Sequence, residues 1–253
     1  MEYFKMETQY GIIKAEERSL LPSTDLLSVN HKGNKLIARY PAFGLGSYLE
    51  NIDAMKQQHF YHSRECSNLL FTPATTSESI SVASHKFAEL AKPEILDIDG
   101  LQLGLIALAS EGIFANPLDE QGEPITDEEI LKTRLNTCKN VHRIYLGAND
   151  FGFAPYETFK SGEQDSGDFA EGGLARLLEH TEERTAPKLK EISSKPNYPT
   201  GVEVVELNEF EFIWPVLRVS RLFSDWHTWG RFYLFGDNID DYFWDGSAFG
   251  VSK

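Results

Sequence analysis

The chain has 253 residues, of which 41% are hydrophobic and 12% are aromatic. This composition is typical of a globular protein, organised as one large domain or two modest ones, with a core large enough to need no disulfide or metal. The formal net charge of −15 repels nucleic-acid phosphates and anionic lipids. Because the sequence contains no basic patch, we expect binding to neither nucleic acid nor membrane.

The sequence also indicates a cellular compartment. No run approaches the roughly 18 apolar residues of a membrane helix, and the first ten residues lack the layout of a signal peptide. Cys66 and Cys138 are the only cysteines, too few for a disulfide framework, although one bridge stays possible. We therefore expect a cytoplasmic protein.

The N-terminal part predicts a hairpin followed by helices. Two short alternating runs flank Asn30–Asn34, where Gly33 can supply the positive φ of a hairpin turn. Apolar residues at helical spacing then predict a helix over residues 45–58, with Ser47 as a possible N-cap. A second helix is expected over about residues 77–91, capped by Thr76 or Ser77.

Residues 101–117 form a long apolar run around Ser110–Gly112. Two strands or one long strand both fit, since the run is too apolar for its periodicity to decide.

The clearest local signature is Thr126–Glu129, a capping box in which Thr126 caps a helix and Glu129 reaches back to its N–H group. We expect this helix to continue to about Lys139 and to bury Leu131, Leu135 and Cys138. A strand is predicted over residues 141–148, a helix over 169–184, and a shorter helix that begins near Thr185 or Ala186.

After residue 200 the pattern becomes β-rich, with strands expected over 202–207, 213–223 and 231–236. All four tryptophans lie in this part of the chain. The order of elements predicts an α+β fold, with an N-terminal β-hairpin, central helices with interspersed strands, and a β-rich aromatic C-terminus. We treat residues 1–253 as a single domain, with a possible subdomain change near 195–201.

One set of residues has the ligand types of a zinc site: His62, Cys66, Cys138 and His142. The alternative for Cys138 is a small hydrophobic residue on the buried face of its helix. The sequence does not show whether the two pairs converge in space.

The C-terminal acidic loop offers oxygen ligands for calcium, namely Asp237, Asp240, Asp241 and Asp245. A solvated loop is the alternative. Beside these acids are aromatic residues that predict either a ligand groove or a sheet core, namely Trp226, Trp229, Tyr242 and Trp244.

Carboxylates for acid–base chemistry can be chosen in many ways from 39 acidic residues. Asp150 is a candidate because it follows an apolar strand, where loop residues of α/β sites often lie, although Asp is also an ordinary turn residue. Asp240 and Asp241 are the other catalytic candidates.

These patterns leave two hypotheses of function. The first is a non-catalytic binding or structural protein, such as an assembly subunit, that contacts a protein partner or small ligand through its aromatic, acidic C-terminal region. The alternative is a carboxylate-dependent hydrolase with a site near Asp150 and Asp237–Asp245, for which a pocket with converging carboxylates is the discriminating feature. No cofactor is required, with calcium and zinc as the alternatives.

The sequence also makes direct predictions of burial. We expect Phe87, Leu131, Leu135 and Ile144 to be buried, and Glu128 and Asp240 to be exposed.

Overall fold

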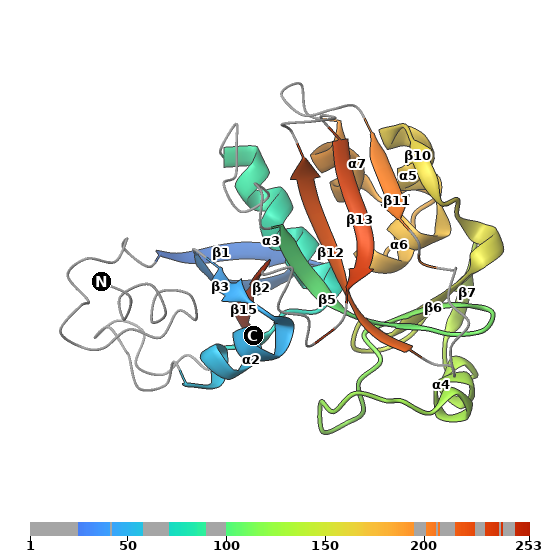
Figure 1. The fold of residues 1–253 in the computed structure, drawn as a ribbon, viewed down its shortest axis with the longest axis horizontal. Coiled ribbons are helices and arrows are strands. Elements are labelled where there is room, and N and C mark those ends of the chain that lie inside the picture. Colours follow the sequence, from blue (N-terminus) through green and yellow to red (C-terminus); the bar gives the residue numbers. More distant parts are fainter. Residues whose placement is uncertain are drawn as a thin grey trace.

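The fold was obtained as a computed structural model (Figure 1). The structure describes residues 25–40, 42–57, 71–89, 100–194, 201–205, 207, 216–225, 231–237, 239 and 246–253. These residues form an α+β fold with an N-terminal hairpin, as the sequence predicts.

The larger of two sheets has eleven strands and is built around β5. Nine of them follow the order β10-β11-β13-β12-β5-β6-β9-β8-β7, and β14 and β3 extend from β5 off this path. The strands are β3 (Phe43–Gly46), β5 (Leu101–Leu108), β6 (Gly112–Ala115), β7 (Lys139–Val141), β8 (Ile144–Leu146), β9 (Gly152–Pro155), β10 (Gly162–Gln164), β11 (Val202–Val205), β12 (Val216–Asp225), β13 (Arg231–Asp237) and β14 (Gly246–Ala248). The predicted C-terminal strands β11, β12 and β13 thus join the same sheet as the central apolar run.

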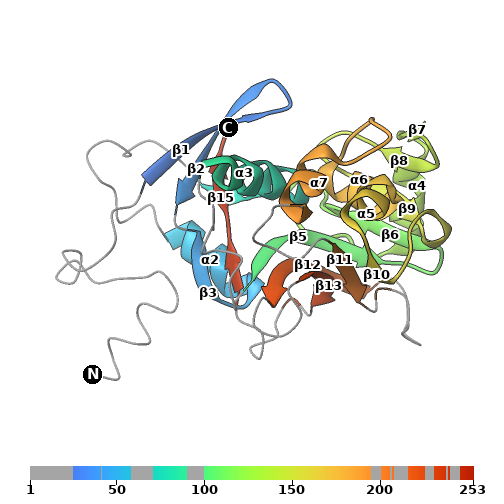
Figure 2. The ribbon, with the colours of Figure 1, turned by 90° about the horizontal axis from the view of Figure 1, so that it is seen from above.

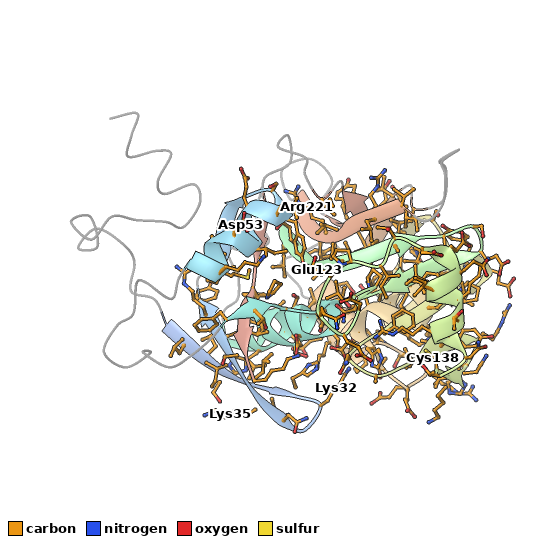
Figure 3. All side chains as sticks on the ribbon, turned by 90° about the horizontal axis from the view of Figure 1, so that it is seen from below. Lys32, Lys35, Asp53, Glu123, Cys138 and Arg221 are labelled. Atoms are coloured by element: carbon orange, nitrogen blue, oxygen red, sulfur yellow. The ribbon has the colours of Figure 1, made fainter. Side chains whose placement is uncertain are left out.

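The smaller sheet has the order β1-β2-β15-β4, from strands β1 (Asp25–His31), β2 (Asn34–Tyr40), β4 (Thr72–Pro73) and β15 (Gly250–Ser252). The predicted hairpin is β1–β2. Its turn is Lys32–Gly33, and both residues have positive φ, 51° and 83°, as a two-residue type I′ turn requires. The hairpin tip carries Lys32 toward the larger sheet, and Figure 3 labels this residue.

Helices cover one face of the larger sheet, as Figure 2 shows from above. They are α3 (Thr76–Glu89), α5 (Ser166–Glu171), α6 (Gly173–Glu179) and α7 (Pro187–Ser193). The short α4 (Glu128–Leu135) packs on the opposite face through the fully buried Leu131. All eight residues of β5 are therefore buried, which explains why the apolar run had no readable periodicity. The structure resolves this run into the two antiparallel strands β5 and β6.

Two helices begin with reciprocal capping boxes. In α2 (Tyr48–Gln57) the Ser47 N–H donates to Glu50 Oε2 at 2.9 Å and the Glu50 N–H donates to Ser47 Oγ at 3.3 Å, which confirms Ser47 as the cap. In α3 the pair is Thr75 and Glu78, so the cap lies one residue before the predicted Thr76. Glu78 lies in the first turn of α3.

The approach of β5 to α3 depends on Gly104. Its φ is 155°, and a Cβ there would lie 2.9 Å from the backbone nitrogen of Thr76. The strand therefore lies directly against the first turn of α3, where only glycine fits without displacing the helix.

The predicted Thr126–Glu129 capping box is wrong by one residue. Asp127 is the N-cap, and its carboxylate accepts from the N–H groups of Glu129 and Ile130. Aspartate caps at least as well as threonine, so the helix begins at Glu128 and ends at Leu135, earlier than Lys139.

Two other predicted elements are divided. The helix expected over 169–184 breaks at Gly172, whose ψ of 149° is extended, and forms α5 and α6. The strand expected over 141–148 turns back at His142 and Arg143, both with positive φ, and forms the hairpin β7–β8. Arg176 Nη2 donates to the His142 carbonyl at 2.9 Å and stabilises this turn.

The burial predictions are confirmed at Leu131 and Ile144, both 0% exposed, while Leu135 is partly buried. The predicted exposure of Glu128 is wrong, because its carboxylate accepts from Ser110 Oγ at 2.7 Å and pairs with Lys132. The side chain of Phe87 and the residue Asp240 lie outside the described residues. Within the described part of the chain, no helix is long and apolar enough to cross a membrane.

Glu179 connects α6 to α7 and gives the fold a testable pH dependence. It is 5% exposed, and its carboxylate accepts from the N–H groups of Lys188 and Leu189. Burial nevertheless raises the pKa of Glu179 above its ordinary value of 4.5. The Glu179 carboxyl therefore binds its proton more tightly in the folded state than in the unfolded state. Its contribution to the unfolding free energy is present at low pH and is lost as the pH rises through the pKa of the folded state.

We therefore expect the unfolding free energy of the wild type, relative to Glu179→Gln, to fall as the pH rises above the ordinary pKa of 4.5 and through the raised pKa of the folded state. Urea denaturation of both proteins measures this difference. Glu171→Gln, which changes an exposed acid on α5, is the control and is expected to show no such trend. A constant difference between wild type and Glu179→Gln contradicts the prediction.

Candidate functional site

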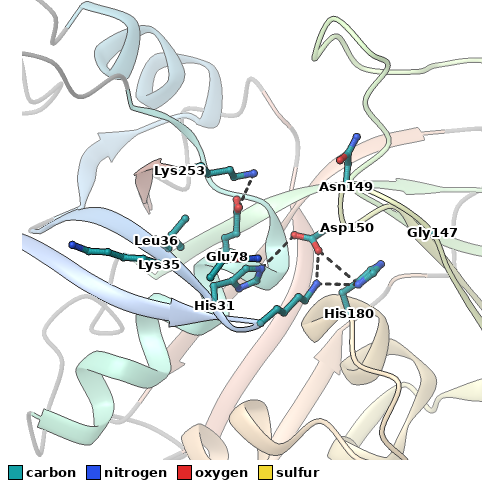
Figure 4. A pocket seen from close by; sticks show the side chains of 11 residues that line it. His31, Lys35, Leu36, Glu78, Gly147, Asn149, Asp150, His180 and Lys253 are labelled. Atoms are coloured by element: carbon teal, nitrogen blue, oxygen red, sulfur yellow. Dashed lines mark hydrogen bonds and ion pairs between the residues drawn. The ribbon is translucent and has the colours of Figure 1, made fainter.

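A pocket of about 510 Å³ lies where the two sheets and two helices meet (Figure 4). Five segments contribute to it: the β1–β2 hairpin, the first turn of α3, the β8–β9 connection, the C-terminal end of α6 and Lys253, which follows β15. The charged and imidazole side chains on its wall include His31, Lys32, Glu78, Asp150, His180 and Lys253.

Asp150 occupies a turn with unusual backbone geometry. Asn149 and Asp150 have φ values of 54° and 58°, a conformation that costs energy for residues other than glycine and that often occurs at functional sites. Asn116 holds the turn by donating from Nδ2 to the Asn149 carbonyl at 2.6 Å. The turn directs the Asp150 carboxylate into the pocket, as Figure 4 shows.

The Asp150 carboxylate has a partner for each oxygen. Lys32 Nζ forms an ion pair with Oδ1, and Thr75 Oγ1 donates to Oδ2 at 2.5 Å. Burial alone would raise the pKa of Asp150, but the charge of Lys32 and these hydrogen bonds outweigh burial and lower it. Asp150 is therefore an anion in the folded protein.

His31 is held in one tautomer by Ser81. Ser81 has a single hydroxyl hydrogen, and it donates this hydrogen to the Ser77 carbonyl at 2.9 Å. The Ser81 oxygen also lies 2.8 Å from His31 Nδ1 and accepts from Lys188 Nζ at 2.7 Å. Because the hydroxyl hydrogen is already used, His31 Nδ1 must carry the proton, and its Nε2 lone pair is free.

His180 is held in the opposite tautomer. Its Nε2 lies 3.2 Å from the Phe151 carbonyl, which can only accept, so Nε2 carries the proton. Nδ1 then accepts from Lys32 Nζ at 3.0 Å and lies 3.7 Å from Asp150 Oδ1. Burial, assisted by the charge of Lys32, lowers the pKa of His180, so the ring is neutral and its lone pair faces the pocket.

The two imidazole tautomers can be measured directly. We expect nitrogen chemical shifts near neutral pH to show the proton on Nδ1 of His31, because Ser81 donates its hydroxyl hydrogen to the Ser77 carbonyl, and on Nε2 of His180, because the Phe151 carbonyl can only accept. Replacement of Ser81 by alanine is expected to release His31 into a tautomer mixture. A wild-type His31 protonated mainly on Nε2 contradicts the hydrogen-bond assignment.

Glu78 adds a second carboxylate to the pocket. It is only 2% exposed; Oε2 accepts from the Thr75 N–H group at 2.9 Å, and Oε1 pairs with Lys253 Nζ at 2.7 Å. Thr75 therefore positions both acids, because its backbone binds Glu78 and its hydroxyl binds Asp150.

Of the residues selected from the sequence, Asp150 lies in this pocket. Cys138 is partly buried against the core near Arg134, and burial raises the pKa of its thiol, while His142 lies in the exposed turn of the β7–β8 hairpin. Because His62 and Cys66 lie outside the described residues, the zinc set stays a prediction.

The C-terminal candidates also lie outside the description. This holds for the residues Trp226, Trp229, Asp240, Asp241, Tyr242, Trp244 and Asp245, and for the side chain of Asp237. The calcium loop and the aromatic binding surface therefore stay predictions.

Sequence reasoning missed His31, Lys32, Glu78, His180 and Lys253. Three of them occupy positions that have local structural explanations: Lys32 is in a hairpin turn, Glu78 is in a capping box, and His180 caps α6 with a φ of 49°. The left-handed conformation at His180, where glycine or asparagine is usual, is the strongest local signal of another role, and it appears only in the structure.

Comparison of the chain with protein-family models, curated proteins and solved structures gives no match.

Proposed function

We propose that the protein is a hydrolase whose active site is the Asp150 pocket, and that the site holds one divalent metal ion between His31, Glu78 and Asp150. One observation carries this proposal: the three side chains offer ligand atoms that all lie within 4.8 Å of one another. They come from three separate elements, so the cluster is a product of the tertiary fold rather than of one acidic segment.

The spacing is close to that of two ligands around one ion. His31 Nε2 and Asp150 Oδ2 are 3.9 Å apart, about 0.3–0.6 Å more than the separation of two ligands on a tetrahedral ion with bonds of about 2.0–2.2 Å. All three ligand atoms lie within 4.8 Å of one another, so side-chain movements of at most about 1.5 Å would bring them to the separations of a tetrahedral site with the same bond lengths.

The surroundings of the ligands favour metal binding. The free Nε2 of His31 is the atom that would bind the ion, while its Nδ1–H donates to Ser81, the arrangement found around histidine ligands in proteins. Thr75 likewise orients both carboxylates by donating hydrogen bonds, from its N–H group to Glu78 and from its hydroxyl to Asp150. One imidazole with two carboxylates suits a first-row ion such as Mn²⁺, Fe²⁺ or Zn²⁺ better than Ca²⁺.

Hydrolysis is the reaction that these groups support best. A bound divalent ion lowers the pKa of a coordinated water and so supplies a nucleophile near neutral pH. His180 is outside the ligand cluster, and its Nδ1 beside Asp150 accepts from Lys32 Nζ, so it would be placed to accept a proton once Lys32 turns toward a bound anion. Lys32 supplies a positive charge for an anion that develops in the reaction.

The experiment is a hydrolysis screen of ester, amide and phosphoester substrates with chelated protein and with protein reloaded with Mn²⁺ or Zn²⁺. We expect activity that appears only with metal and is lost in Asp150→Asn. Activity that is equal in chelated and reloaded protein, or that survives in Asp150→Asn, contradicts the metal site. No activity on any substrate class contradicts the hydrolase assignment and favours the binding-protein hypothesis.

A further inference from the structure

The pocket carries more positive charge than the rest of this acidic chain suggests. The protein has a formal net charge of −15, yet Lys32, Lys35 and Lys253 all line the pocket. Two of them neutralise its two carboxylates, since Lys32 pairs with Asp150 and Lys253 pairs with Glu78. Lys35 lies farther out on β2, as Figure 4 shows.

A metal ion changes this balance of charge. A divalent ion bound by Glu78 and Asp150 neutralises both carboxylates, so Lys32 and Lys253 lose the charge that balances theirs. Two ammonium groups and a divalent ion against two carboxylates leave a surplus of two positive charges. In a pocket that is partly shielded from water, such a surplus attracts an anion of matching charge.

The two lysines can move to meet that anion. Their side chains are 36% and 67% exposed, and each has a flexible four-carbon stem. Lys32 is at the tip of a hairpin, and Lys253 follows β15, so neither ammonium group is enclosed by the core.

Resting on the proposed function, we infer that the pocket binds the phosphate group of a phosphorylated small-molecule substrate, with Lys32 and Lys253 as its anchors beside the metal. Near neutral pH a phosphate monoester carries close to two negative charges and three acceptor oxygens, which match the surplus charge and the ammonium donors. A monocarboxylate supplies only one charge. The pocket volume of about 510 Å³ is within the usual range for small-molecule sites.

The test is calorimetric titration of the Mn²⁺-loaded full chain with inorganic phosphate, and with acetate for comparison. We expect phosphate to bind more tightly than acetate. Lys32→Gln is expected to weaken phosphate binding by about 10–100-fold, the range of a charge-assisted hydrogen bond. The same variant is expected to bind Mn²⁺ as tightly as the wild type or more tightly, because Lys32 no longer competes for Asp150.

The different effects on the two affinities distinguish a role of Lys32 in anion binding from a structural role. Loss of a structural role would weaken the binding of both phosphate and Mn²⁺. Lys160→Gln changes an exposed lysine outside the pocket and is expected to leave both affinities unchanged. Lys253→Gln is the second variant if Lys32→Gln does not fold, and it is expected to weaken phosphate binding as well.

The outcomes distinguish this inference from the proposed function. If Mn²⁺ binds but phosphate does not, if acetate binds equally well, or if Lys32→Gln binds phosphate like the wild type, the inference is overturned and the metal site stands. If Mn²⁺ itself does not bind, the proposed function fails and the inference fails with it.

Discussion

Replacement of Asp150 by asparagine is expected to weaken Mn²⁺ binding by more than about 100-fold, beyond the 10–100-fold typical of an outer-shell partner. Asparagine keeps the shape of the side chain but removes the negative charge that attracts the metal ion. An amide is also a poorer ligand than a carboxylate for such an ion. The same change removes the ion pair with Lys32. Calorimetric titration of chelated protein measures the loss.

Asp53→Asn is the matched control for this experiment. Asp53 is an exposed acid on α2 (Figure 3) and does not line the pocket, so we expect its removal to leave Mn²⁺ affinity unchanged. An equal effect of both substitutions would mean that the overall negative charge attracts the ion. Unchanged Mn²⁺ affinity in Asp150→Asn would show that Asp150 is not a ligand of the ion.

The largest expected effect on stability is that of Phe151→Ala, about 3–5 kcal/mol. Phe151 is 1% exposed, its ring stacks on Phe114 with centroids 5.9 Å apart, and the guanidinium of Arg134 lies 4.2 Å from its ring centroid. Truncation leaves a cavity directly behind the Asp150 turn. Urea denaturation monitored by fluorescence measures the change in unfolding free energy.

Phe151→Leu is the comparison for this prediction, because it keeps most of the buried volume. We expect it to cost less than Phe151→Ala while removing the same aromatic contacts. Equal losses in both variants would mean that the ring interactions, rather than the cavity, determine the effect. A loss below about 1 kcal/mol in Phe151→Ala would contradict the packing of Phe151 against Phe114 and Arg134.

Much of the fold could be predicted from local patterns. The β1–β2 hairpin follows from alternating residues around Gly33, and α2 follows from Ser47 and its helical apolar spacing. The errors occurred where two local choices compete. Asp127 and Thr126 can both cap α4, and Gly172 can either continue a helix or end it.

The site was far less predictable, because its members meet only through long-range packing. Thr75 and Asp150 are 75 positions apart in sequence, and Lys32 and His180 are 148 apart. Asp150 could be selected because it follows a strand, but nothing near it in sequence indicated a histidine or lysine partner. Glu78 was hidden in a capping box, where its second role as a pocket carboxylate leaves no local trace.

The most direct test of the metal site is pulsed electron spin resonance of the Mn²⁺-loaded protein, which detects nitrogen nuclei bound to the ion. We predict coupling to one imidazole nitrogen, lost in His31→Gln and retained in His142→Gln, which changes an exposed histidine of the β7–β8 turn. Absence of imidazole coupling in the wild type, or its persistence in His31→Gln, would contradict a metal ion bound between His31, Glu78 and Asp150.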